Sequence, residues 1–182
     1  MEDVFGGLAG GPGDGSGGAP VDIPALEAAL DGAALWGLEL DPRFRVLAAT
    51  LEPTAERYPW GETDDRRIQL LCFPVSTILG SFRRNLPMET ELLSFTEAQL
   101  VDVVAAFDGA IVAAPLFGRP EPRPGTWGPR FSLEGRSSAP DGTRRTVTLA
   151  LAHEDLTLHL FARFDELQLK APDGRDLALL PD

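Results

Sequence analysis

The sequence predicts an α+β protein built on an antiparallel sheet, and three observations lead to this class. Apolar and polar residues alternate in many short runs, most clearly from residue 130 onward, which is the period of strands with one buried face. Short turn sequences with Pro, Asp and Gly separate these runs. Only one longer segment, 96–107, has the apolar spacing of a helix.

We therefore expect a meander-rich sheet of roughly seven to nine strands, curved or forming a partial barrel. One main helix should pack on this sheet, and a short helix should precede it. The alternative is a β-sandwich with helical additions.

The composition is that of one globular domain behind a flexible leader. The chain has 182 residues, of which 43% are hydrophobic and 24% charged. Residues 1–20 are rich in glycine and have few side chains that could offset the entropy of ordering. We expect a flexible leader over 1–20 and a single α+β domain over 21–182.

The first elements of the domain are a helix and a hairpin. Asp22 is an N-cap candidate, Pro24 lies in the first turn, and Asp31-Gly32 ends a helix over 23–30. Apolar runs at 35–40 and 44–51 then flank Asp41-Pro42-Arg43, which predicts a hairpin.

The middle of the chain holds the interrupted strand and the main helix. A polar loop over 52–66 precedes apolar runs at 67–73 and 75–82, which Pro74 divides into one bent strand or two short ones. Thr96 and Gln99 have capping-box spacing, the apolar stripe runs to Phe107, and Gly109 can stop the helix. Residues 110–117 read as a buried strand.

The last third of the chain is predicted to be β throughout. Residues 119–129 contain four prolines and should form an extended loop. Strands are expected over 131–137, 145–152, 155–164, 167–170 and 176–180. The turn sequence Ala-Pro-Asp-Gly occurs twice between them, at 139–142 and 171–174.

Charge and cysteine content limit the class of partner and the compartment. The formal net charge of −12 argues against a nucleic-acid partner and favours a basic protein partner. No apolar run of 18 residues or signal peptide is present, so no membrane association is predicted. Cys72 is the only cysteine, and Lys170 is the only lysine among 16 basic residues. We expect a cytoplasmic protein from a GC-rich bacterium.

Both histidines lie in one stretch, 150–166, together with Glu154, Asp155 and Asp165. Period two places His153 at a hairpin connection and His159 on the following strand, about 20 Å apart in extended chain. Two ligands at that distance cannot share one ion, so no metal site is predicted. Cys72 has the strand parity of core residues, and no nucleophile-elbow motif exists. We predict no cofactor and no catalytic residue.

Two groups of residues remain as binding candidates. Tyr58, Trp60 and Trp127 lie in loops beside Pro and Gly, where a rigid ring can bind a partner or close an end of the core. The second group consists of Thr157, His159 and Arg163, which share one strand face, together with Arg130. That face could line a pocket, or it could carry ordinary cross-strand polar pairs.

These observations favour a non-enzymatic, cytoplasmic binding or accessory protein that acts through protein contacts. One specific form is an acidic inhibitor or immunity-type partner of a basic protein. The alternative is a small-molecule-binding protein or enzyme with a pocket on the sheet around His159 and Arg163. The sequence does not predict an oligomeric state.

Overall fold

The computed structural model describes residues 21–60, 64–122, 131–134 and 145–177. This part is mostly antiparallel sheet with few helices, and its seven strands form one sheet rather than the two of a sandwich. The predicted leader lies outside it. In chain order the elements are α1 (Ile23–Leu30), β1 (Ala34–Asp41), β2 (Val46–Glu52), the 3-10 turn η1 (Ala55–Arg57), β3 (Ile68–Asn85), β4 (Thr90–Leu93), the 3-10 turn η2 (Glu97–Gln99), α2 (Leu100–Ala105), β5 (Phe131–Glu134), β6 (Arg145–His153) and β7 (Leu156–Lys170).

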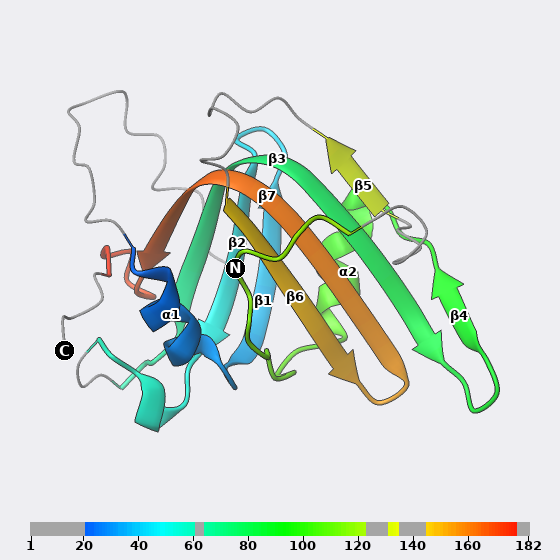
Figure 1. The fold of residues 1–182 in the computed structure, drawn as a ribbon, viewed down its shortest axis with the longest axis horizontal. Helices are drawn as coiled ribbons and strands as arrows, with labels where there is room; N and C mark the ends of the chain where they lie inside the picture. The colour runs from blue at the N-terminus through cyan, green and yellow to red at the C-terminus, as the bar shows by residue number, and fades with distance from the viewer. Residues whose placement is uncertain (1–20, 61–63, 123–130, 135–144, 178–182) are drawn as a thin grey trace.

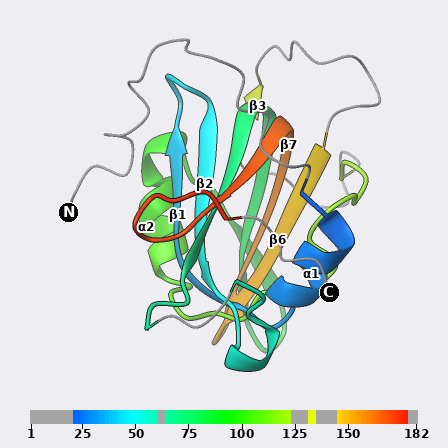
Figure 2. The ribbon, with the colours of Figure 1, turned by 90° about the vertical axis from the view of Figure 1, so that its left-hand side faces the viewer.

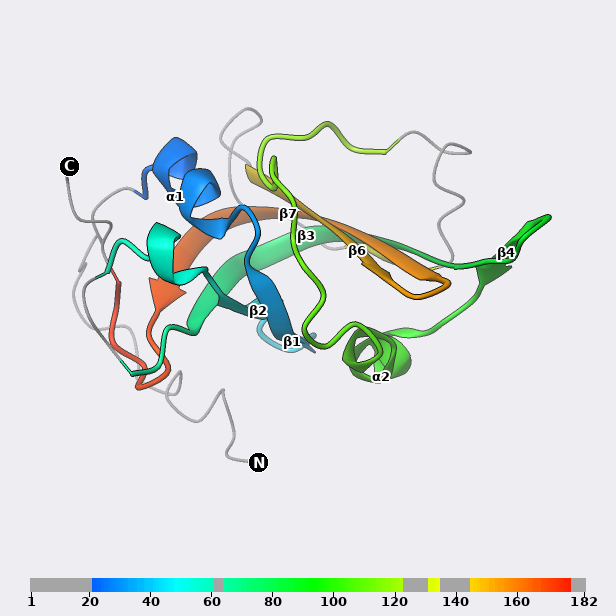
Figure 3. The ribbon, with the colours of Figure 1, turned by 90° about the horizontal axis from the view of Figure 1, so that it is seen from below.

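Two long strands form the centre of the sheet. The strand order is β1-β2-β3-β7-β6, and β7 pairs with β3 along nearly its whole length. The other edge of β3 is shared by three strands in succession, with β2 at its start, β5 in its middle and β4 at its end. The end of β3 and β4 therefore project on the side away from α1, as Figures 1 and 3 show.

The sheet curves around one core and is not closed. Figure 2 shows the strands following one another from β1 to β6 around this curve. The residues that pack together inside it come from the strands and from both helices, and they include Leu26, Leu30, Leu38, Leu51, Ile78, Leu100, Val104, Phe107, Leu149, Leu160 and Phe164. Their burial removes apolar surface from water and is the main stabilising contribution to the fold.

The segment 110–118 joins the two edge strands of the sheet. The Val112 N–H donates to the Ala33 carbonyl beside β1 at 2.8 Å, and the Leu116 carbonyl accepts from the Thr148 N–H of β6 at 2.7 Å. The prediction of a strand over 110–117 is wrong, because the segment makes only isolated bridges to two different strands. Pro115, which has no N–H to donate, lies between the two contacts.

Two carboxylates of the α1 region hold this segment in place. Glu27 Oε1 accepts from the Phe117 N–H at 2.7 Å, and Asp31 Oδ1 accepts from the Ala114 N–H at 3.2 Å. The N-terminal helix thus has a second role besides covering the core.

The main helix is much shorter than predicted. Its first residues form η2. At its end the Phe107 N–H donates to the Val104 carbonyl and the Asp108 N–H donates to the Ala105 carbonyl, which is the hydrogen-bond spacing of a 3-10 turn. Only six residues remain α-helical, fewer than in α1. The predicted apolar stripe is nevertheless buried, with Leu100, Val104 and Phe107 in the core.

Other predicted elements have mixed outcomes. The N-terminal helix and the first hairpin are confirmed, with the Asp22 side chain accepting from the Ala25 N–H at 3.2 Å. The runs at 67–73 and 75–82 form one strand, as do those at 155–164 and 167–170. Of 176–180, Asp176 makes a single bridge to Lys170, and residues beyond 177 lie outside the described part. Strand β4 was not predicted.

Candidate functional site

The predicted aromatic loop at Tyr58 and Trp60 packs onto the core. Both side chains are half-buried against the main cluster, and their rings meet edge to face with centroids 5.2 Å apart. Burial, followed by the charge of Asp65, raises the pKa of Tyr58. These contacts are those of residues that close an end of the core. Trp127 and Arg130 lie outside the described residues.

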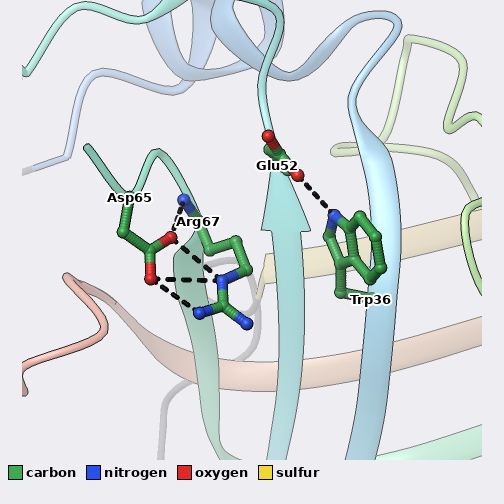
Figure 4. Close-up of polar contacts among 4 residues, drawn as sticks. All are labelled: Trp36, Glu52, Asp65 and Arg67. Carbon is green, nitrogen blue, oxygen red and sulfur yellow. Dashed lines mark hydrogen bonds and ion pairs between the residues drawn. The ribbon is translucent and has the colours of Figure 1, made fainter. Parts of the chain in front are cut away.

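Of the two tryptophans in the described residues, Trp36 is the exposed one, and sequence reasoning did not single it out. Figure 4 shows its indole N–H donating to Glu52 Oε2 of the neighbouring strand, at 2.7 Å, beside the Asp65–Arg67 pair. Strand periodicity with Leu35 buried could have placed Trp36 on the outside. Its hydrogen bond fixes the ring across β1 and β2.

A hollow of about 390 Å³ lies between α1 and η1, lined by residues that include Asp31, Thr54 and Arg57. The Arg57 guanidinium donates to the Asp31 carboxylate at 2.5 Å and to its backbone carbonyl at 2.7 Å. This hydrogen bond is the largest of the effects that lower the pKa of Asp31. Asp31 and Arg57, two of the three charged residues that line the hollow, are thus bound to each other and stabilise the α1 end.

Thr157, His159 and Arg163 do share one face of β7, the face directed away from the core. We call it the outer face and define it by these residues and their cross-strand neighbours. The register places Arg83 opposite Thr157 and Ser81 opposite His159 on β3, and Thr146 opposite Arg163 on β6. The pairing of β3 with β7 could not be read from either strand alone.

The outer face is partly covered by the chain after residue 118. The hydroxyl of Thr146 donates to the Arg119 carbonyl at 2.9 Å, and Arg163 forms an ion pair with Glu121. Phe161, between His159 and Arg163 on this face, is fully buried. The outer face is therefore covered in part by residues 119–121, which polar contacts with Thr146 and Arg163 hold in place.

The two histidines occupy different places. His153 is exposed at the end of β6, whereas His159 is half-buried on the outer face. Burial lowers the pKa of His159, and the nearby charges of Arg83 and Arg119 lower it further. Within the described residues, no three His, Cys, Asp or Glu side chains gather in a metal-binding arrangement.

Cys72 is a core residue. Its side chain is buried within the main cluster, and burial raises the pKa of the thiol far above the usual range. The thiol therefore stays protonated at neutral pH and is a poor nucleophile.

Met88, the most exposed large apolar side chain of the described residues, lies on a projecting region that the sequence did not reveal. We call it the arm and define it as residues 82–93 and 153–157, which comprise the β3–β4 hairpin and the tip of the β6–β7 hairpin. Met88 is 95% exposed, and Leu86 and Leu92 are 38% and 37% exposed. These three are among only seven large hydrophobic residues that are exposed in the described part.

Side-chain and backbone contacts join the two hairpins of the arm. The Asn85 N–H donates to the Asp155 carbonyl at 2.6 Å, and its side-chain amide donates to the Thr157 hydroxyl at 2.8 Å. Arg84 lies between Glu91 and Asp155, at 3.7 and 3.5 Å from their carboxylates. The arm is thus one cross-linked unit rather than a loose loop.

The arm also carries four exposed acidic residues, which we call its acidic border: Glu89, Glu91, Glu154 and Asp155. Its arginines are Arg83 and Arg84, and Arg84 pairs with Glu91 and Asp155. The arm therefore combines exposed apolar side chains with an excess of acidic ones.

Comparisons with known proteins found no matching family model, curated protein or solved structure. Among the described helices, none has the length and apolar character needed to cross a bilayer.

Proposed function

We propose that this chain is a non-enzymatic, cytoplasmic bacterial protein that acts by binding another protein through the arm. The observation that carries the proposal is the exposure of Met88 at the β3–β4 turn, with Leu86 and Leu92 also exposed in the same hairpin. In the specific form we favour, the partner is a basic protein that this acidic chain inhibits or neutralises.

Exposed apolar side chains in one projecting hairpin favour a contact function over a purely structural one. An exposed apolar group gains free energy when a partner removes it from water. Methionine suits this role because its unbranched thioether adapts to the shape of a pocket. Met88, at the end of a projecting hairpin, can enter a concave partner surface that a flat sheet could not reach.

The cross-links within the arm support the same proposal. The Asn85 and Arg84 contacts order the two hairpins before any partner arrives. A preordered surface loses less conformational entropy on binding, so more of the contact energy contributes to affinity.

The acidic border accounts for the choice of a basic partner. Protein interfaces commonly have an apolar centre and a polar rim, and complementary rim charges speed association and select partners. The four carboxylates of the arm and the net charge of −12 suit a partner whose pocket is bordered by Lys and Arg.

The test compares two charge insertions at exposed apolar positions. Met88→Asp changes the arm, and Phe44→Asp, at a 58% exposed residue in the β1–β2 turn, is the matched control. Proteins retained from a lysate of the native host by the wild-type chain are identified, and the purified candidate is then titrated against all three chains. We expect Met88→Asp to weaken binding at least about tenfold, or about 1.4 kcal/mol, with an unchanged melting temperature, and Phe44→Asp to bind as the wild type does.

Equal binding by Met88→Asp and wild type would remove the arm from the interface. Equal loss in both variants would point to a general effect of added charge. Affinity should also fall as ionic strength rises, because salt screens exposed charges.

A further inference from the structure

Beyond the arm, the outer face holds Arg163 and the hydroxyl side chains of Thr146 and Thr148. Arg163 lies opposite Thr146, and Phe161 lies opposite Thr148. Thr148 is therefore a diagonal neighbour of Arg163 on the same face, within reach of a long side chain. This placement is independent of the proposed function.

Arg163 already binds a carboxylate, that of Glu121. The Arg163 side chain is 28% exposed and that of Glu121 is 42% exposed, so the ion pair is open to solvent. The Thr146 hydroxyl holds the backbone at Arg119, two residues before Glu121, whereas Arg163 is the one partner of the Glu121 carboxylate among the described residues. An exposed ion pair of this kind contributes little to stability.

Thr148 provides a second, separate observation. Only 6% of the residue is exposed, and its buried hydroxyl oxygen has no hydrogen-bond partner within the described part of the chain. A buried hydroxyl without a partner is uncommon, because burial removes its hydrogen bonds to water. An incoming oxygen atom would satisfy it.

The surroundings of these two residues favour a negative ligand. Arg83 and Arg119 both lie close enough to His159 to lower its pKa through their charge. Three arginines thus lie on or beside one face of a chain whose net charge is −12. Guanidinium groups are strong hydrogen-bond donors to carboxylates, and Arg163 donates one such hydrogen bond to Glu121.

We propose that the outer face binds a small-molecule carboxylate, which replaces Glu121 on Arg163 and accepts a hydrogen bond from the Thr148 hydroxyl. Glu121 then acts as an internal competitor that occupies the arginine when the ligand is absent. The alternative function predicted from the sequence is a small-molecule-binding protein, and this proposal specifies a carboxylate as the ligand.

Because Glu121 competes with the ligand for Arg163, removing the Glu121 charge should strengthen ligand binding rather than weaken it. Succinate is titrated at constant ionic strength by calorimetry and by amide NMR shifts. Glu121→Gln should tighten succinate binding about tenfold, the increase expected if Glu121 occupies Arg163 about nine-tenths of the time. Glu56→Gln, which removes an exposed carboxylate from η1, is the charge-matched control and should bind as the wild type does.

Two further variants locate the binding. In the Glu121→Gln background, Arg163→Gln should abolish the gain, and Thr148→Val should weaken binding while the melting temperature stays the same. The proposal is overturned if Glu121→Gln binds no tighter than wild type, if Glu56→Gln gives the same gain, or if Arg163→Gln leaves the gain in place. Inorganic phosphate is the second probe, and binding of phosphate without binding of succinate would also overturn it.

Discussion

The α1 end of the sheet and the arm use their large side chains in opposite ways. At the α1 end, Tyr58 and Trp60 turn onto the core and contact each other. On the arm, Leu86, Met88 and Leu92 extend into solvent although the backbone around them is firmly cross-linked. Similar apolar chemistry thus stabilises the fold at one end and is available for contact at the other. Residue type alone does not distinguish the two uses.

The largest difference expected between the two ends is in stability. Trp60→Ala should lower the free energy of unfolding by about 2 kcal/mol, less than for a fully buried tryptophan because Trp60 is half-buried. The melting temperature should then fall by about 5 °C. Met88→Ala should change the free energy of unfolding by less than about 0.5 kcal/mol, since its side chain is almost wholly exposed. Equal losses in the two variants would remove the distinction.

A second, smaller effect concerns the stability of the α1 end at acid pH. The Arg57 hydrogen bond, with that from the Ala114 N–H, lowers the pKa of Asp31 below its ordinary 3.8. A carboxyl whose pKa is lowered by folding stabilises the protein above its unfolded pKa, and this stability is lost as pH falls through the folded value. Asp31→Asn should therefore reduce the loss of melting temperature between pH 6 and pH 2.

Arg57→Gln should produce the same reduced acid sensitivity, because it removes the main cause of the lowered pKa. Thermal unfolding across this pH range measures both variants. An acid sensitivity equal to that of wild type in both would show that the Asp31–Arg57 contact does not stabilise the α1 end.

The local elements of the α1 end were predictable because their signals are local. Asp22, Pro24 and Gly32 mark the limits of α1, and the turn at Pro42 marks the first hairpin. The helix at 96–107 was only partly predictable. Its apolar stripe shows which face is buried, but the competition between α-helical and 3-10 hydrogen bonds at its ends leaves no clear sequence pattern.

The arm and the segment 110–118 were not predictable for a different reason. Residues 86–92 show no buried period because they are exposed on both sides. Asn85, directly before them, contacts Asp155 and Thr157, some 70 residues away in the chain. The segment 110–118 likewise depends on which strands lie at the edges of the sheet.

The outer face was predictable in part. Period two correctly places Thr157, His159 and Arg163 on one face, because that period is a property of a single strand. The addition of Ser81 and Arg83 requires the register of β3 against β7. The contacts of Arg119 and Glu121 depend on the path by which residues 110–121 reach the edge of β6, which no local pattern specifies.

The most direct test of binding through the arm is amide hydrogen exchange of the chain, alone and in complex with its purified protein partner. We predict slower exchange in the complex at residues 82–93 and 153–157, with no change at residues 55–60 of the α1 end. Slower exchange confined to residues outside the arm would contradict the proposed contact surface.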